Sequence, residues 1–128
     1  DASDEARGVS RWLDEHLNAA EPIGVSDLVL SAMVRIGTSH RAYQRPVTPN
    51  EALVFADALR ASPGTVLVQP GPRHWRLFTD LVRQHDLRAK HVPDAFLAAM
   101  ALEVSATFVT RDRGFDRFPG LRMLDPLA

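Results

Sequence analysis

The chain has 128 residues, of which 45% are hydrophobic, and its formal net charge is -1. This length and composition predict one folded globular domain over residues 1–128 and exclude a disordered or fibrous chain. The absence of cysteine excludes disulfide frameworks and thiolate metal sites. No apolar run approaches the ~20 residues needed to span a bilayer, and no signal-peptide pattern opens the chain. We therefore expect a cytoplasmic protein with no membrane partner.

The first half of the sequence alternates helical and strand-like patterns. Apolar residues recur at helical spacing from Ser3 to Leu17. The segment "PIGVS" predicts a short strand, which feeds a second helix from about Leu28 to Ile36. "TPNE", Thr48 to Glu51, is a capping box with proline at the first helical position, and it opens a third helix that ends near Ala61.

The second half continues the alternation. "TVLVQ" is a compact β-branched run typical of a buried strand, and "PGP" precedes a fourth helix, which carries Trp75 and Phe78. A helix that is apolar on all sides runs from Asp94 to about Glu103, followed by "ATFVT" as a strand and "LRMLD" as a last short strand. Strands that alternate with helices predict a three-layer α/β fold with a mainly parallel sheet.

Two acids flank the helix and strand in the second half. The helix from Asp94 to Glu103 rises ~1.5 Å per residue, roughly 15 Å in all. The strand that follows returns about the same distance at ~3.3 Å per residue. Asp112, just past this strand, should therefore arrive close to Asp94. The carboxyl ends of parallel strands form one edge of a sheet, where ligands bind.

Asp27 occupies an equivalent position, because it follows the strand "IGV" at the start of the next helix. Carboxylates that converge repel one another unless a cation binds between them, and Mg²⁺ or Mn²⁺ suits oxygen ligands. The simpler explanation of Asp94 is that an acid in the first turn complements the helix dipole. We favour the metal site, and we expect Asp94→Asn to abolish activity while folding stays intact or improves.

Basic residues gather beside these acids, in "GPRHWR" and "TRDRGFDRF". Mixed charges of this kind suit a site that holds a metal and an anionic substrate together. Arg73, His74, Arg111 and Arg113 are therefore candidate substrate-binding residues. We place Arg73 and His74 at the same sheet edge as Asp94, although both residues could simply begin a helix after the "PGP" turn.

The ordered series "SDLVL…PGPRHW…VPDA…TRDRGF…RFPGLR…DPL" resembles PIN domains in the branch of VapC toxins from toxin–antitoxin pairs. The resemblance covers nearly the whole chain, although "PDA" alone is a weak signal. It implies a Mg²⁺-dependent endoribonuclease that inhibits translation by cutting RNA. Asp94 matches the family's aspartate at the start of this helix, and Asp112 matches the acid after the fourth strand.

The sequence departs from the family pattern at three places. PIN domains open with a central strand that ends in an aspartate, whereas this chain opens with "DASDEARG", where Asp1 lies in the wrong context. We expect that about a dozen further residues precede it, enough for one strand and its turn. Ala32 stands where many relatives have a glutamate, and Asp27 is the candidate substitute. Gly114 stands where a further acid is common, and Asp116 is either a compensating ligand or part of a surface ion pair with Arg117.

The resemblance also implies partners: a cognate VapB-type antitoxin, an RNA substrate and a second copy in a homodimer. We predict that the antitoxin lies across the edge formed by Asp27, Arg73, Asp94 and Asp112. One of its arginines would compete with Mg²⁺ for the acids, because arginine binds carboxylates in a bidentate fork. The amphipathic first and third helices would anchor it.

Two other functions remain to be separated from catalysis. A receiver-type phosphoacceptor domain also places acids at strand ends, but it needs a lysine at a later strand end. The only lysine here, Lys90, precedes the apolar helix, which disfavours that class. The second alternative is a non-catalytic PIN-like protein that binds RNA or antitoxin, and a test of metal-dependent cleavage would distinguish it.

Overall fold

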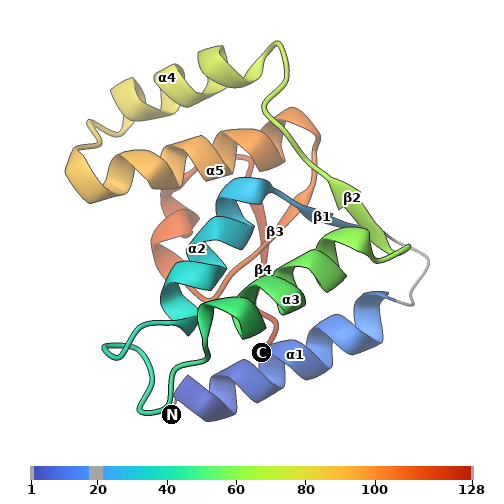
Figure 1. Cartoon of the computed structure of the whole chain (residues 1–128). Coiled ribbons are helices and arrows are strands. Elements are labelled where there is room, and N and C mark those ends of the chain that lie inside the picture. Colours follow the sequence, from blue (N-terminus) through green and yellow to red (C-terminus); the bar gives the residue numbers. More distant parts are fainter. Residues whose placement is uncertain (1, 18–21, 128) are drawn as a thin grey trace. The chain divides into compact units, whose positions relative to one another are not determined.

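The structure, a computed structural model, describes residues 2–17 and 22–127 (Figure 1). Asp1 lies outside the described residues. Contacts within the chain divide it into two compact units: residues 1–68 with Leu127, and residues 69–126. The prediction of a single domain over the whole chain stays a prediction.

The first unit contains α1 (Ala2–Leu17), β1 (Ile23–Val25), α2 (Asp27–Gly37), α3 (Pro49–Ala61) and β2 (Thr65–Leu67). Strand β1 pairs in parallel with β2, with Ile23 opposite Thr65. The buried side chains of Val25, Leu30, Ala56 and Leu59 form its core. Strand β1 leads directly into α2, whose first turn is capped by the Ser26 hydroxyl.

The predicted capping box at the start of α3 is confirmed. The Thr48 hydroxyl accepts from the backbone N–H of Glu51 at 3.1 Å, and the Glu51 carboxylate accepts from the Thr48 N–H at 3.4 Å. These reciprocal bonds satisfy two backbone donors that the first turn of a helix leaves free. The local sequence therefore fixes where α3 begins.

The second unit contains α4 (His74–Gln84), the 3₁₀ helix η1 (Ala89–His91), α5 (Val92–Glu103), β3 (Thr107–Val109), the 3₁₀ helix η2 (Arg113–Arg117) and β4 (Arg122–Leu124). Strand β3 pairs in parallel with β4, with Phe108 opposite Met123. Helices α4 and α5 pack side by side (Figure 1). The two strands and η2 follow α5 in the chain.

Helix α5 supplies most of the second unit's core. Ala95, Ala98 and Ala99 are completely buried and pack with Leu81 of α4 and with Phe118. Alanines at these positions let α4 approach closely, since a larger side chain would hold the helices apart. The prediction of a buried helix that is apolar on all sides is confirmed.

The predicted fold class is confirmed, because helices alternate with strands and every described strand pair is parallel. One detail is wrong. The segment "TVLVQ" was predicted to form a buried strand, yet Val66 is 50% exposed and Leu67 is 42% exposed. Among the described residues β2 pairs with β1 alone, so this strand lacks the neighbours that bury a central strand. No helix in the described ranges is long and apolar enough to cross a membrane.

Candidate active site

Asp94 lies in the first turn of α5, after Pro93. Its carboxylate is only 23% exposed, and one oxygen, Oδ2, accepts a hydrogen bond from Arg117 Nη2 at 2.9 Å. His91 Nδ1 lies 3.6 Å from the same oxygen. Across residues 2–17 and 22–127, Oδ1 of Asp94 has no partner, so the carboxylate keeps one oxygen for a ligand.

Asp112 begins η2 as its N-cap residue. Its Oδ1 accepts from the backbone N–H of Gly114 at 2.8 Å, and its own N–H donates to the Thr110 hydroxyl at 3.0 Å. A Cβ atom at position 114 would lie 3.0 Å from Oδ1 of Asp112, so the glycine gives this carboxylate its room. Asp112 is exposed, and its Oδ2 has no partner within the described residues.

Arg117 links the two acids. It ends η2, the helix that Asp112 begins, and its guanidinium binds Asp94 on α5. A 3₁₀ helix rises ~2.0 Å per residue, so the five residues of η2 span roughly 10 Å. The structure thus brings the elements that carry Asp94 and Asp112 together, and the sharing of one ion by both acids stays a prediction.

Asp116 is exposed on η2. The alternative of a surface ion pair between Asp116 and Arg117 is wrong, because the guanidinium of Arg117 turns to Asp94 instead. A role for Asp116 as a metal ligand stays a prediction.

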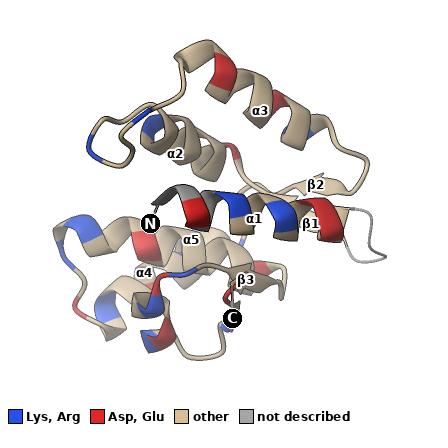
Figure 2. Cartoon of the chain, turned by 90° about the horizontal axis from the view of Figure 1, so that it is seen from below, with Lys and Arg blue, Asp and Glu red and all other residues tan. Residues whose placement is uncertain are grey.

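The two candidate arginines beside Asp112 differ in their surroundings. Arg111 Nε lies 3.1 Å from the Asp125 carboxylate, which follows β4. Arg113 is exposed, and its side chain has no partner in the part of the chain that the structure describes. Basic and acidic positions both occur along the ribbon of this unit (Figure 2). Arg113 is therefore the more available of the two for an anionic substrate.

Arg73 and His74 begin α4, and their side chains contact α5. The Arg73 guanidinium donates to the backbone carbonyl of Glu103, the last residue of this helix, at 2.6 Å. His74 is 2% exposed, and its Nε2 lies 2.8 Å from the Phe96 carbonyl. Asp94 and Glu103 are nine positions apart, about 14 Å along a helix. This geometry corrects the expected place of Arg73, which lies at the end of α5 that is far from Asp94. Substrate binding by Arg73 and His74 stays a prediction.

Glu103 holds the turn before α4 against the end of α5. Its two carboxylate oxygens accept from the backbone N–H groups of Gly71 and Arg73, each at 2.8 Å. The bond from Gly71 lowers the pKa of Glu103 most, and the bond from Arg73 adds to it. A Cβ atom at position 71 would lie 2.7 Å from this carboxylate, so a larger residue there would have to displace the Glu103 side chain.

Asp27 belongs to the first unit, where it opens α2 as predicted. Its carboxylate binds Arg60 of α3 through Nε at 2.8 Å and Nη2 at 3.4 Å. The hydrogen bond from Arg60 lowers the pKa of Asp27. Asp27 therefore has a partner within its own unit, and its convergence with Asp94 and Asp112 stays a prediction.

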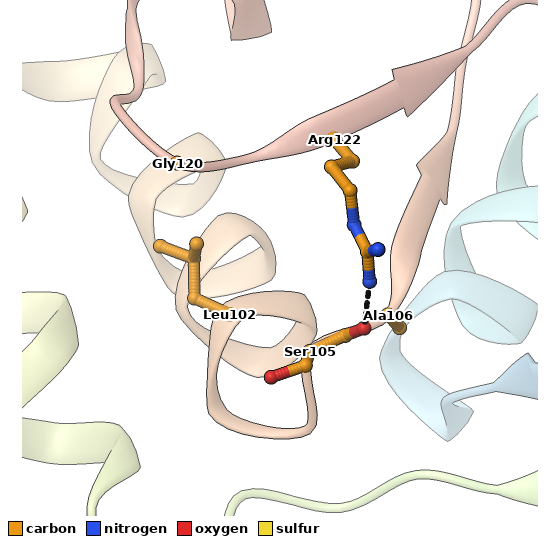
Figure 3. A pocket seen from close by; sticks show the side chains of 5 residues that line it. All are labelled: Leu102, Ser105, Ala106, Gly120 and Arg122. Carbon is orange, nitrogen blue, oxygen red and sulfur yellow. Dashed lines mark hydrogen bonds between the residues drawn. The ribbon is translucent and has the colours of Figure 1, made fainter.

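Within the described ranges, no three His, Cys, Asp or Glu side chains gather closely enough to enclose a metal ion. A small open pocket of about 290 Å³ lies beside Leu102, near the C-terminal end of α5 (Figure 3). Leu102, Ser105 and Gly120 line it, and Arg122 donates across it to the Ser105 carbonyl. This pocket lacks carboxylates and is separate from the candidate site.

Sequence reasoning missed Arg117 and Glu103. Arg117 stands in the basic motif beside Asp116, and nothing local shows that it reaches Asp94. Glu103 interrupts an apolar helix, and a buried acid in such a pattern indicates a side chain with hydrogen-bond partners elsewhere in the fold.

Comparison with known proteins finds similar chains of known family. The PIN-domain family model matches residues 2–121. The chain is 41% identical to ribonuclease VapC43 of Mycobacterium tuberculosis over 115 residues, which cover 90% of this chain and 78% of the relative. It is 36% identical to ribonuclease VapC31 of the same species over 120 residues, 94% of this chain and 84% of the relative.

A solved structure shares the fold. It is VapBC2 from Rickettsia felis, crystallised with a DNA fragment from the promoter of that pair, with a TM-score of 0.60 and 20% sequence identity. The match covers 88% of this chain and 80% of that chain.

Proposed function

The chain belongs to the PIN-domain family, in its branch of VapC ribonucleases, and we propose that it is an endoribonuclease toxin whose metal ion is held by Asp94 and Asp112. The observation that carries the proposal is the pair of acids on α5 and η2. Each acid keeps one carboxylate oxygen without a partner among the described residues, and Arg117 ties the two elements together.

The donor set fits Mg²⁺ or Mn²⁺. These ions prefer carboxylate oxygens, and Mg²⁺ usually keeps several waters while one or two carboxylates and a substrate phosphate complete its shell. Asp27 and Asp116 are proposed as further ligands, in place of the acids that relatives carry at positions 32 and 114.

When bound, such an ion activates a water and stabilises charge on the phosphodiester that is cleaved. The chain's own groups bind and orient the RNA. Arg113 is exposed one residue from Asp112, so its guanidinium is available to an RNA phosphate. Arg111 lies on the other side of Asp112 and is a second phosphate contact, in exchange for Asp125.

RNA cleavage by the full-length protein tests this proposal. Asp94→Asn and Asp112→Asn should each abolish cleavage, and EDTA should abolish it in the wild type. Asp80→Asn is the matched control, because Asp80 lies on exposed α4 surface and only approaches Arg83 at 3.9 Å. If a folded Asp94→Asn protein still cuts RNA, the roles of Asp94 are only structural, in the helix dipole and in the pair with Arg117. If the wild type binds RNA without cutting it, the non-catalytic alternative holds.

We also propose a VapB-type antitoxin as partner, with inhibition of translation in the cytoplasm as the consequence of RNA cleavage. The apolar surface on α3 supports a protein partner: Leu53, Val54 and Phe55 are all exposed, and Val54 is 60% exposed. A second copy of the chain is the other proposed partner for this apolar surface on α3. Light scattering of the protein with and without its antitoxin distinguishes a homodimer from a complex of two different chains.

A further inference from the structure

The contact between Arg117 and Asp94 differs from the other arginine–carboxylate pairs of the described chain. Its side chains are 30% and 23% exposed, whereas the others are between 35% and 80% exposed. A pair with so little water around it is weakly screened. Arg117 therefore acts as a fixed counter-charge for Asp94 when no metal is bound.

The guanidinium of Arg117 is held in place, but not all of its N–H donors have hydrogen-bond partners. It lies 5.1 Å from the centre of the Phe118 ring, and Phe118 is buried in the core. Nη2 binds Asp94 and lies 3.4 Å from His91 Nδ1. Nε is buried and has no hydrogen-bond partner among the described residues. The Nε–H group, which lies on the same side of the guanidinium as Nη2, is thus an unsatisfied donor.

Asp94 cannot serve Arg117 and a divalent ion equally well. An ion at ~2.0–2.6 Å from a carboxylate oxygen would lie within a few ångströms of the guanidinium on the other oxygen. The two positive charges would repel each other strongly in a partly buried site. Arg117 must therefore leave Asp94, or weaken the binding of the ion, unless an anion joins the site.

An RNA phosphate is the anion that fits. Once the guanidinium turns away from Asp94, two phosphate oxygens can accept from Nε and Nη2 together, in the bidentate fork that suits arginine. This would satisfy the Nε donor, which in the present conformation is buried without a partner among the described residues. We propose that Arg117 exchanges Asp94 for a phosphate of the bound RNA, so that RNA and metal bind cooperatively. This inference rests on the proposed function and adds a phosphate-binding residue to it.

Binding measurements test the exchange directly. Mn²⁺ is titrated by calorimetry into the full-length protein, alone and with a single-stranded RNA hexamer whose phosphorothioate linkages resist cleavage. The variants are Arg117→Gln, Asp94→Asn and the control Arg83→Gln, which removes an exposed guanidinium of α4 in the same unit. Circular dichroism verifies that each variant is folded.

Arg117→Gln should bind Mn²⁺ roughly 5-fold or more tightly than the wild type when RNA is absent, within the usual range of coupling between sites. The hexamer should raise the Mn²⁺ affinity of the wild type by a similar factor and leave that of Arg117→Gln unchanged. Arg83→Gln should match the wild type in both titrations.

Unchanged or weaker Mn²⁺ binding by folded Arg117→Gln would overturn the proposed exchange of Asp94 for phosphate. Loss of Mn²⁺ binding in Asp94→Asn would at the same time support the proposed metal site. Normal binding by Asp94→Asn would overturn that site itself. If Arg117→Gln does not fold, Arg117→Lys replaces it, since lysine keeps the charge but not the fork. Its coupling between RNA and Mn²⁺ should fall, and coupling equal to that of the wild type would refute the inference.

Discussion

Replacing Asp94 by asparagine separates the structural role of this residue from its chemical role. The change removes the charge that faces Arg117, whose Nε already lacks a hydrogen-bond partner in the described chain. Exposed ion pairs contribute ~0–1 kcal/mol, whereas breaking a buried pair costs about 3–5 kcal/mol. This pair is about one quarter exposed, and an asparagine oxygen can still accept from Nη2. Because Asp94 pairs with Arg117, we expect a loss of about 1–2 kcal/mol in the free energy of unfolding, in place of the intact or improved folding that the sequence alone predicted.

For a chain of 128 residues this loss corresponds to a Tm that is lower by roughly 3–10 °C. Thermal and urea unfolding of Asp94→Asn, Arg117→Gln and the double variant form a double-mutant cycle, with Asp80→Asn as the exposed control. The double variant should lose less stability than the sum of the single losses. A Tm that is unchanged or raised by Asp94→Asn would refute the reasoning, because it would mean that repulsion from other acids outweighs the bond to Arg117.

Three further predictions concern stability. Phe118→Ala should cost roughly 3–5 kcal/mol, because it empties a core position that is 2% exposed; urea unfolding measures this loss. Thr48→Ala should cost about 1 kcal/mol by removing one half of the capping box, and a lower urea midpoint at unchanged slope would show it. The pKa of Glu103 is lowered on folding, so its stabilisation is present above the ordinary value of 4.5 and is lost as pH falls through the lower folded value. Tm measured between pH 7 and pH 3 should therefore fall less steeply in Glu103→Gln.

The sequence predicted those features whose causes are local. The capping box at Thr48 and the start of α5 near Pro93 are set by residues within one helical turn. The all-round apolar pattern of α5 correctly predicted its burial, since only a helix covered on every side avoids polar positions. The parallel strands followed from the alternation of helical and strand patterns.

The features that failed depend on tertiary contacts. Arg73 follows β2 in sequence, but Glu103 draws its backbone and guanidinium to the far end of α5. Arg117 is next to Asp116 in the sequence, yet it pairs with Asp94, 23 positions earlier. Side-chain reach of this kind leaves no periodic pattern in a sequence, so neither contact had a signal that could be read in advance.

The bonds from Glu103 also bear on the order in which the second unit folds. Gly71 and Glu103 are 32 positions apart, and their hydrogen bond closes a loop that contains all of α4 and most of α5. Contacts between these helices involve shorter separations and can form early, whereas the carboxylate finds its amides only after both helices are in place. Glu103→Gln should therefore accelerate unfolding and leave the folding rate nearly unchanged, as expected of a contact made after the transition state. The hydrogen bonds between Glu103 and the turn before α4 would then slow the unfolding of α4 and α5 without changing how fast they fold.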